Sequence, residues 1–154
     1  ANADVGDTTI ACESVSNPAP GQPGGPPVSQ PPADTRAPAL TLSGDTKQKS
    51  KKKLVFEVTC DESCGVDVSG TIKVPIVKSK GKTKKKTYDL KESSADLGAS
   101  SPETIKLTYS GKVAKKLKKA LKAKKKSTAT IEASATDAAG NKSPTEKLKI
   151  KVKK

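Results

Sequence analysis

Two cysteines, Cys60 and Cys64, are the side chains in this sequence best suited to specific chemistry. A zinc site would need two more soft ligands, but the sequence has no histidine and one further cysteine, the distant Cys12. A redox-active C-x-x-C pair has two residues between its cysteines, whereas three separate this pair. The sequence therefore favours a disulfide that closes a tight turn over a reduced pair, and leaves Cys12 as the odd cysteine.

Carboxylates gather around the same turn, at Asp61, Glu62 and Asp67. A pair of carboxylates can hydrolyse glycosidic bonds, but the sequence places no aromatic platform for a sugar beside them. The lack of histidine also removes the Ser-His-Asp and Cys-His arrangements. We therefore expect a solvated turn rather than a catalytic pair. The prediction is a protein that is not an enzyme, with no catalytic, cofactor-binding or metal-binding residue and no cofactor.

A second hypothesis concerns Asp34 and Asp137, which lie far apart in the sequence. Both could lie near one end of the domain and share a calcium ion between neighbouring modules, as oxygen ligands do in some repeat proteins. Spacing alone gives little support to this idea. Calcium binding between modules therefore stays open, and no metal site is predicted from these two residues.

Lysine dominates the charge of the chain, which is +14 overall. Residues 37–154 hold all 29 lysines and 12 acidic residues, a net charge of +17, whereas Arg36 is the one arginine. Arginine is the side chain that reads phosphate or guanine with two parallel hydrogen bonds, so its scarcity argues against specific nucleic-acid recognition. Stacking aromatics typical of single-strand binders are missing too.

The lysines form three clusters, which are predicted to lie on loops and on the outer face of a helix. A solvated surface is the simplest interpretation, and electrostatic adhesion to anionic polymers is the functional alternative. The clusters are Lys47–Lys53, Lys78–Lys86 and Lys115–Lys126. The candidates for contact with a polyanion are Lys82, Lys84, Lys85, Lys86, Lys115, Lys116, Lys118 and Lys119.

The elements that must position these residues follow from the apolar pattern. Residues 1–16 are predicted to be a disordered remnant of an upstream region, and residues 17–38 a linker rich in proline and glycine. From residue 39 to 154, apolar residues mostly alternate with polar ones in short runs, which predicts about seven strands. One segment, 111–123, has an apolar stripe at helical spacing behind the N-cap Ser110. Residues 78–86 are predicted to be a hairpin loop.

Two short motifs lie near the ends of this domain, Asp34-Thr35-Arg36-Ala37-Pro38 and Ala135-Thr136-Asp137-Ala138-Ala139-Gly140-Asn141. Together with the segment LTLSG after the first motif, these motifs resemble the bacterial immunoglobulin-like repeats of secreted and cell-surface proteins, in particular the lysine-rich actinobacterial type with a C-x-x-x-C pair. The resemblance implies an all-β, immunoglobulin-like antiparallel sandwich, with the second motif as the turn between its last two strands. The helical segment 111–123 departs from that family and leaves the strand order open.

These observations predict a structural or spacer module of a multidomain secreted or cell-surface bacterial protein. The alternative is a cationic adhesion module that binds anionic cell-surface polysaccharide or other polyanions without sequence specificity. The partners would be neighbouring domains of the same chain and anionic cell-wall polymers or glycans. No apolar run is long enough for membrane insertion. Because the chain begins at Ala1, we expect it to be a processed form or a fragment.

Overall fold

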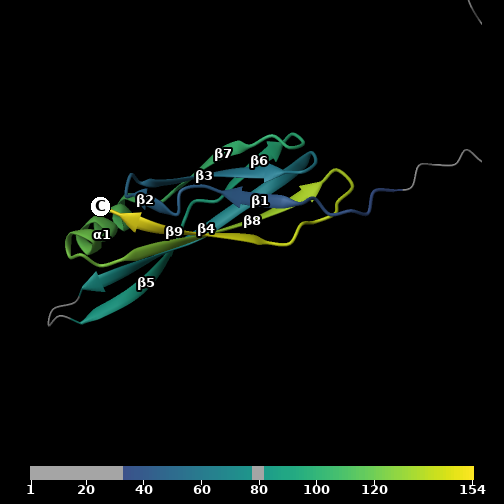
Figure 1. Ribbon diagram of the computed structural model, residues 1–154. Coiled ribbons are helices and arrows are strands. Elements are labelled where there is room, and N and C mark those ends of the chain that lie inside the picture. Colours follow the sequence, from purple (N-terminus) through teal and green to yellow (C-terminus); the bar gives the residue numbers. More distant parts are fainter. Residues whose placement is uncertain (1–32, 78–81) are drawn as a thin grey trace, which may run out of the picture. The chain divides into compact units, whose positions relative to one another are not determined.

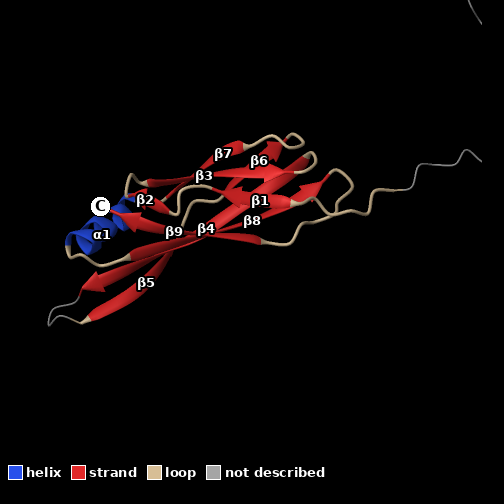
Figure 2. Cartoon of the chain, in the orientation of Figure 1, coloured by secondary structure: helices blue, strands red, loops and turns tan. Residues whose placement is uncertain are grey.

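The computed structural model describes residues 33–77 and 82–154 of the chain. The predictions for residues 1–16 and for most of the 17–38 linker lie outside these residues. The chain divides into two units, Ala1–Pro32 and Ala33–Lys154. The second unit is mostly β-structure with one helix among its described residues (Figures 1 and 2), so the expectation of an all-β fold with a short helix is confirmed.

The strands form two sheets that are mostly antiparallel. The smaller sheet has the order β1-β3-β7, and the larger has the order β2-β9-β8-β4-β5, with β6 also paired to β4. One pairing, β2 with β9, is parallel. The strands are β1 (Leu40–Ser43), β2 (Lys47–Lys49), β3 (Lys53–Cys60), β4 (Cys64–Val77), β5 (Thr83–Asp89), β6 (Ser93–Leu97), β7 (Glu103–Thr108), β8 (Ser127–Asp137) and β9 (Glu146–Lys153).

One hydrophobic core joins the two sheets. Alternate residues of β3, Leu54, Phe56 and Val58, are fully or almost fully buried, because successive side chains of a strand point to opposite faces. The facing positions of β4 are valine and isoleucine. Those of β8 are mainly alanine. The buried residues of β4 and β8 include Val66, Val68, Ile72, Val74, Ala129, Ile131, Ala133 and Ala135.

The helix α1 (Gly111–Lys122) forms where its apolar stripe predicts. The hydroxyl of Ser110 accepts a hydrogen bond of 3.3 Å from the backbone N–H of Val113, which caps the first turn as expected. Val113, Leu117 and Ala120 are buried, with Leu117 at 0% exposure, and they hold the helix against β4 and β8. The remaining face of the helix is lysine.

The structure has nine strands in its described part, so the expectation of about seven is not confirmed. The two unexpected strands, β2 and β6, are short: β2 has three residues and no apolar side chain, and the alternation in β6 is limited to Ala95 and Leu97. Residues 78–81 of the predicted hairpin loop 78–86 lie outside the described residues, and the loop prediction is wrong from Thr83 onward. Thr83 to Lys86 pair with Val77 to Val74 in strand β5, because the apolar β4 supplies backbone partners to an otherwise polar segment.

A side chain bridges the two sheets near β2. Gln48 lies in β2, whose backbone pairs with β9, but its amide reaches β3 of the other sheet. The side-chain Oε1 accepts a hydrogen bond of 2.9 Å from the backbone N–H of Val55, and Nε2 donates to the carbonyl oxygen of the same residue. Gln48 thus takes the place of a strand partner beyond the end of β1, which stops pairing at Glu57.

Candidate functional site

The turn between β3 and β4 is closed by a disulfide, as the cysteine spacing favours. Cys60 and Cys64 are joined, and their Cα atoms are 6.6 Å apart. Both residues are buried, with exposures of 0% and 5%. The bond therefore fixes the ends of two central strands from inside the core and places the acidic residues of the turn at the surface.

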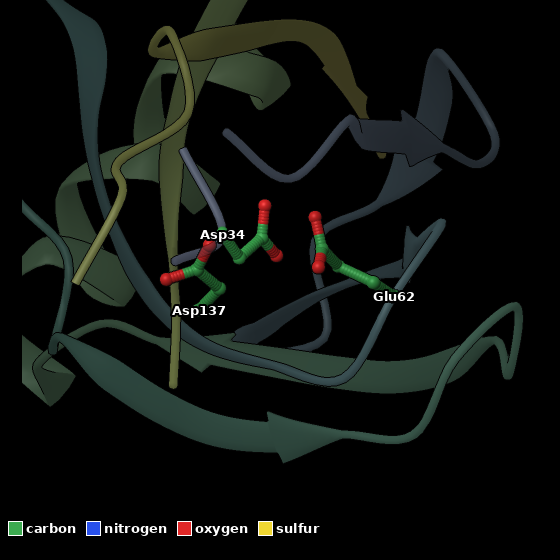
Figure 3. A group of neighbouring side chains, drawn as sticks. All are labelled: Asp34, Glu62 and Asp137. Carbon is green, nitrogen blue, oxygen red and sulfur yellow. The ribbon is translucent and has the colours of Figure 1, made fainter. Parts of the chain in front are cut away.

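Residues far apart in the sequence meet at this end of the domain. Carboxylate oxygens of Asp34, Glu62 and Asp137 all lie within 4.8 Å of one another, and the three side chains face a common space (Figure 3). Asp34 precedes β1, Glu62 lies in the disulfide turn and Asp137 ends β8. We call these three residues and Asp61 the acidic end. The structure brings Asp34 and Asp137 together at one end of the domain, which is the arrangement that the calcium hypothesis assumes.

Hydrogen bonds join the two sequence motifs near the ends of the domain, 34–38 and 135–141. The carboxylate of Asp137 accepts two bonds of 2.8 Å from Asn141, one from its backbone N–H and one from its side-chain amide. The same amide donates to the backbone carbonyl of Asp34 at 3.1 Å. Asn141 therefore links the last turn to the segment that leads into β1, a role that its position in a turn alone does not indicate.

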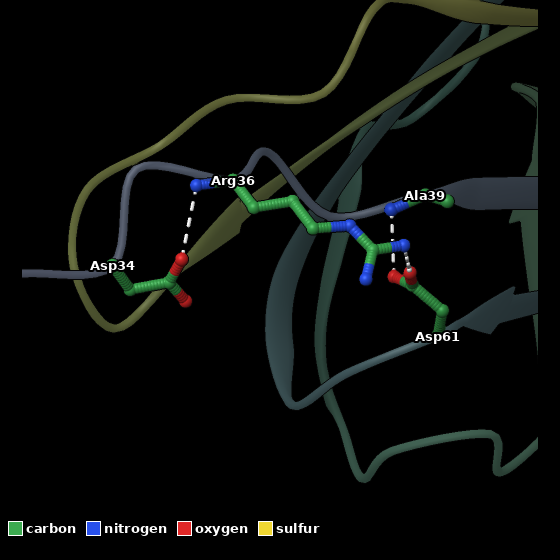
Figure 4. A network of polar contacts seen from close by, with 4 residues as sticks. All are labelled: Asp34, Arg36, Ala39 and Asp61. Atoms are coloured by element: carbon green, nitrogen blue, oxygen red, sulfur yellow. Dashed lines mark hydrogen bonds and ion pairs between the residues drawn. The ribbon is translucent and has the colours of Figure 1, made fainter.

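A second link runs from Arg36 to the disulfide turn (Figure 4). The guanidinium of Arg36 forms an ion pair of 2.8 Å with Asp61, whose other carboxylate oxygen accepts a bond of 2.7 Å from the backbone N–H of Ala39. The backbone N–H of Arg36 donates to Asp34 at 2.9 Å. The polar residues before β1 thus hold the chain against the turn.

The electrostatics of the acidic end follow from these contacts. Partial desolvation, and then the negative charges of Asp34, Asp61 and Asp137, raise the pKa of the Glu62 carboxyl, and Arg36 opposes this effect. The side-chain hydrogen bond from Asn141 is the main cause that lowers the pKa of Asp137, against desolvation. One carboxylate is therefore held in its charged form while its neighbour resists ionisation.

Asp67 does not join this cluster, although the sequence groups it with Asp61 and Glu62. It is exposed on β4, paired with Ser94 of β6 and Ser134 of β8. It lines a groove with Glu92 and Glu132. Strand pairing rather than distance along the chain decides which carboxylates become neighbours.

The predicted polyanion-contacting lysines lie at the opposite end of the sheets, which we call the lysine end: α1 with residues 123–126, residues 82–86 and residues 47–53. Lys82 precedes β5, Lys84, Lys85 and Lys86 lie in it, and Lys115, Lys116, Lys118 and Lys119 lie in α1. All are exposed. Because side chains alternate along a strand, Lys84 and Lys86 share one face of β5 and Lys85 lies on the other.

Tyr88 joins two of these lysine groups, although it is not among the residues predicted to contact a polyanion. The Nζ of Lys86 lies 5.6 Å from the centroid of its ring, and that of Lys116 lies 5.1 Å from it. Lys116 Nζ also donates a hydrogen bond of 3.1 Å to the Tyr88 hydroxyl. The alternation of Lys86 and Tyr88 on one strand face was the available signal, but the approach of α1 depends on tertiary packing.

Comparison with known proteins adds little to this geometry. No family model matches the chain, and no curated protein matches it. A solved structure similar to part of it is the crystal structure of Spo0M, a sporulation control protein from Bacillus subtilis, at 11% sequence identity and a TM-score of 0.37. The similarity covers 77% of this chain and 49% of that one, so the chain spans about half the length of Spo0M.

The described part of the chain contains one helix, α1. It is too short and too rich in lysine to cross a membrane.

Proposed function

We propose that residues 39–154 form a non-catalytic spacer module, with an immunoglobulin-like arrangement of strands, in a multidomain secreted or cell-surface bacterial protein. The observation that carries the proposal is that the described chain enters and leaves the module at opposite ends. Leu40 pairs with Cys60 beside the disulfide turn, whereas Lys153 near the C-terminus pairs with Lys49 at the lysine end (Figure 1). Modules of this geometry extend a chain when they are joined in series.

The strand order supports the immunoglobulin-like part of the proposal. In that fold one sheet contains the first, second and fifth strands, and the other contains the third, sixth and seventh. The order β1-β3-β7 corresponds to the first set, and β9-β8-β4 corresponds to the second. The parallel pair of β2 with β9 fits a first strand that crosses from one sheet to the other.

The disulfide supports the proposed location. Disulfides persist in oxidising surroundings such as the extracellular space and are rare in the cytosol of most organisms. Cys60 and Cys64 are joined inside the core, where the bond stabilises the fold rather than taking part in exchange chemistry. A secreted or surface-exposed module is the setting in which such a bond endures.

Single-molecule force spectroscopy tests the spacer proposal. Pulling on handles attached at Ala33 and Lys154 loads the β2–β9 pair along its strands, so several hydrogen bonds must break together. We expect distinct unfolding events at substantial force. As a matched control, handles at Gly98 and Ala138, which both lie near the acidic end, should open the sheets one bond at a time and at lower force. Equal and low forces in both geometries would contradict the proposal.

A further inference from the structure

Tyr88 joins lysines of β5 to lysines of α1 at the lysine end. Lys86 and Lys116 contact the ring, and Lys84 lies on the same face of β5 as Lys86. Residues three or four apart share a face of a helix, so Lys112 and Lys119 flank Lys116 on α1. We call these five residues the Tyr88 lysine surface. It brings together two of the three clusters that are separate in the sequence.

This surface is short of compensating negative charge. Residues 109–127 contain nine lysines and neither aspartate nor glutamate. Both ion pairs among the described residues, Arg36–Asp61 and Lys147–Glu132, lie elsewhere. Neighbouring lysines repel one another, and a polymer with regularly spaced negative charges would relieve that repulsion and release bound counterions.

The type of cation and the scarcity of aromatics favour a polysaccharide over a nucleic acid. Lysine is a compact, hydrated point charge that binds single anionic oxygens, whereas bidentate recognition of phosphate or guanine uses arginine. The single arginine, Arg36, lies at the acidic end. Of the aromatic residues, Phe56 and Tyr109 are buried, and Tyr88 is already bounded by two lysines, so none offers a free platform for a base.

We propose that the Tyr88 lysine surface binds a linear anionic polysaccharide, with lysines of α1 and β5 contacting successive charged groups of the polymer. This surface lies at the opposite end of the module from residues 33–39, which lead into β1 at the acidic end. The proposal does not depend on the spacer function, since a module can bind such a polymer whether or not it bears force.

Titration calorimetry with heparin, a sulfated polysaccharide, tests the proposal at about 0.15 M salt, where exposed charges are strongly screened. The variant K84Q/K86Q/K116Q removes three charges around Tyr88. The matched control K106Q/K142Q/K149Q removes three exposed lysines from β7, the last turn and β9. We expect the first variant to bind heparin about tenfold more weakly than the wild type, and the control to change affinity much less.

Two outcomes of the heparin titration would overturn the proposal. Equal weakening in both triple variants would show that net charge alone attracts the polymer, and undetectable binding by the wild type would remove the site. Circular dichroism melts of each variant confirm that the fold is retained. A single-stranded oligonucleotide with the same number of charges completes the test: we expect weaker binding than to heparin, and equal or tighter binding would contradict the choice of a polysaccharide.

Discussion

At the acidic end, Asp61 and Asp137 are held by Arg36, Asn141 and backbone N–H groups, whereas the lysines of α1 have no carboxylate partner among the described residues. The first arrangement uses charge to connect segments that are distant in the sequence. The second leaves charge free for a partner or for solvent. The comparison indicates that one end of the module is organised to hold the chain and the other to present a surface.

Helix docking should give the largest effect, because the lysine end depends on a few apolar anchors. Leu117 is fully buried, and Leu117→Ala should lower the free energy of unfolding by about 2–5 kcal/mol, measured by urea denaturation. Leu121→Ala, at a half-buried position of the same helix, is the matched control and should cost clearly less. Similar losses for both variants would mean that the helix is not anchored through Leu117.

The disulfide should give the next largest effect, at the acidic end. Replacing both cysteines, in Cys60→Ala/Cys64→Ala, frees a short loop in the unfolded chain and should cost about 2 kcal/mol on loop-entropy scaling. The urea midpoint measures this loss. A reducing agent should lower the midpoint of the wild type and leave that of the variant unchanged. If the reductant leaves the wild type unaffected, the bond does not stabilise the turn.

A charge reversal in α1 tests how the unpaired lysines of the lysine end affect stability. The first turn of α1 has no acidic residue, so Lys112→Glu would add a favourable charge there and pair with Lys115 and Lys116. We expect a gain of about 0.5–1 kcal/mol in the free energy of unfolding, which decreases in high salt. Lys122→Glu makes the same charge change in the last turn and should give no gain. Equal gains would point to net charge alone.

Glu62 should give the smallest effect, and one that depends on pH. Its pKa is raised in the folded state, so folding favours the protonated form and stability is lost as pH rises from the ordinary value of 4.5 through the folded value. Glu62→Gln should therefore raise the melting temperature slightly at pH 7 and leave it unchanged at pH 3. Glu57→Gln, on the exposed face of β3, is the control. A gain that persists at pH 3 would exclude the electrostatic cause.

Local pattern was enough to predict the parts of this module that depend on neighbours in the sequence. The stripe of Val113, Leu117 and Ala120 behind Ser110 predicts α1, and alternation predicts β3, β4 and β8. The spacing of Cys60 and Cys64 favoured the disulfide. In each case the signal lies within a short segment, so no knowledge of the sheet order was needed.

The structural features that could not be predicted from the sequence depend on residues that are distant along the chain. The segment Lys47–Lys49 has no apolar residue, and it becomes a strand because β9 lies beside it and because Gln48 bonds to Val55. Likewise, Thr83–Lys86 has the composition of a loop, and it forms a strand because β4 supplies its hydrogen-bond partners. The meeting of Glu62 with Asp34 and Asp137, and that of Lys116 with Tyr88, follow from sheet order and helix packing.

Two of the three outer strands of the larger sheet, β2 and β5, are among the strands richest in lysine; the third, β6, is short. An unpaired strand edge is a template on which a second chain can add and start aggregation, and lysine opposes this because each added copy brings like charges together. Gln48 gives similar protection to β3 by occupying the backbone groups of Val55. Where many copies of this module are crowded together, these features disfavour fibre growth from the edges at β2 and β5 and beside Val55.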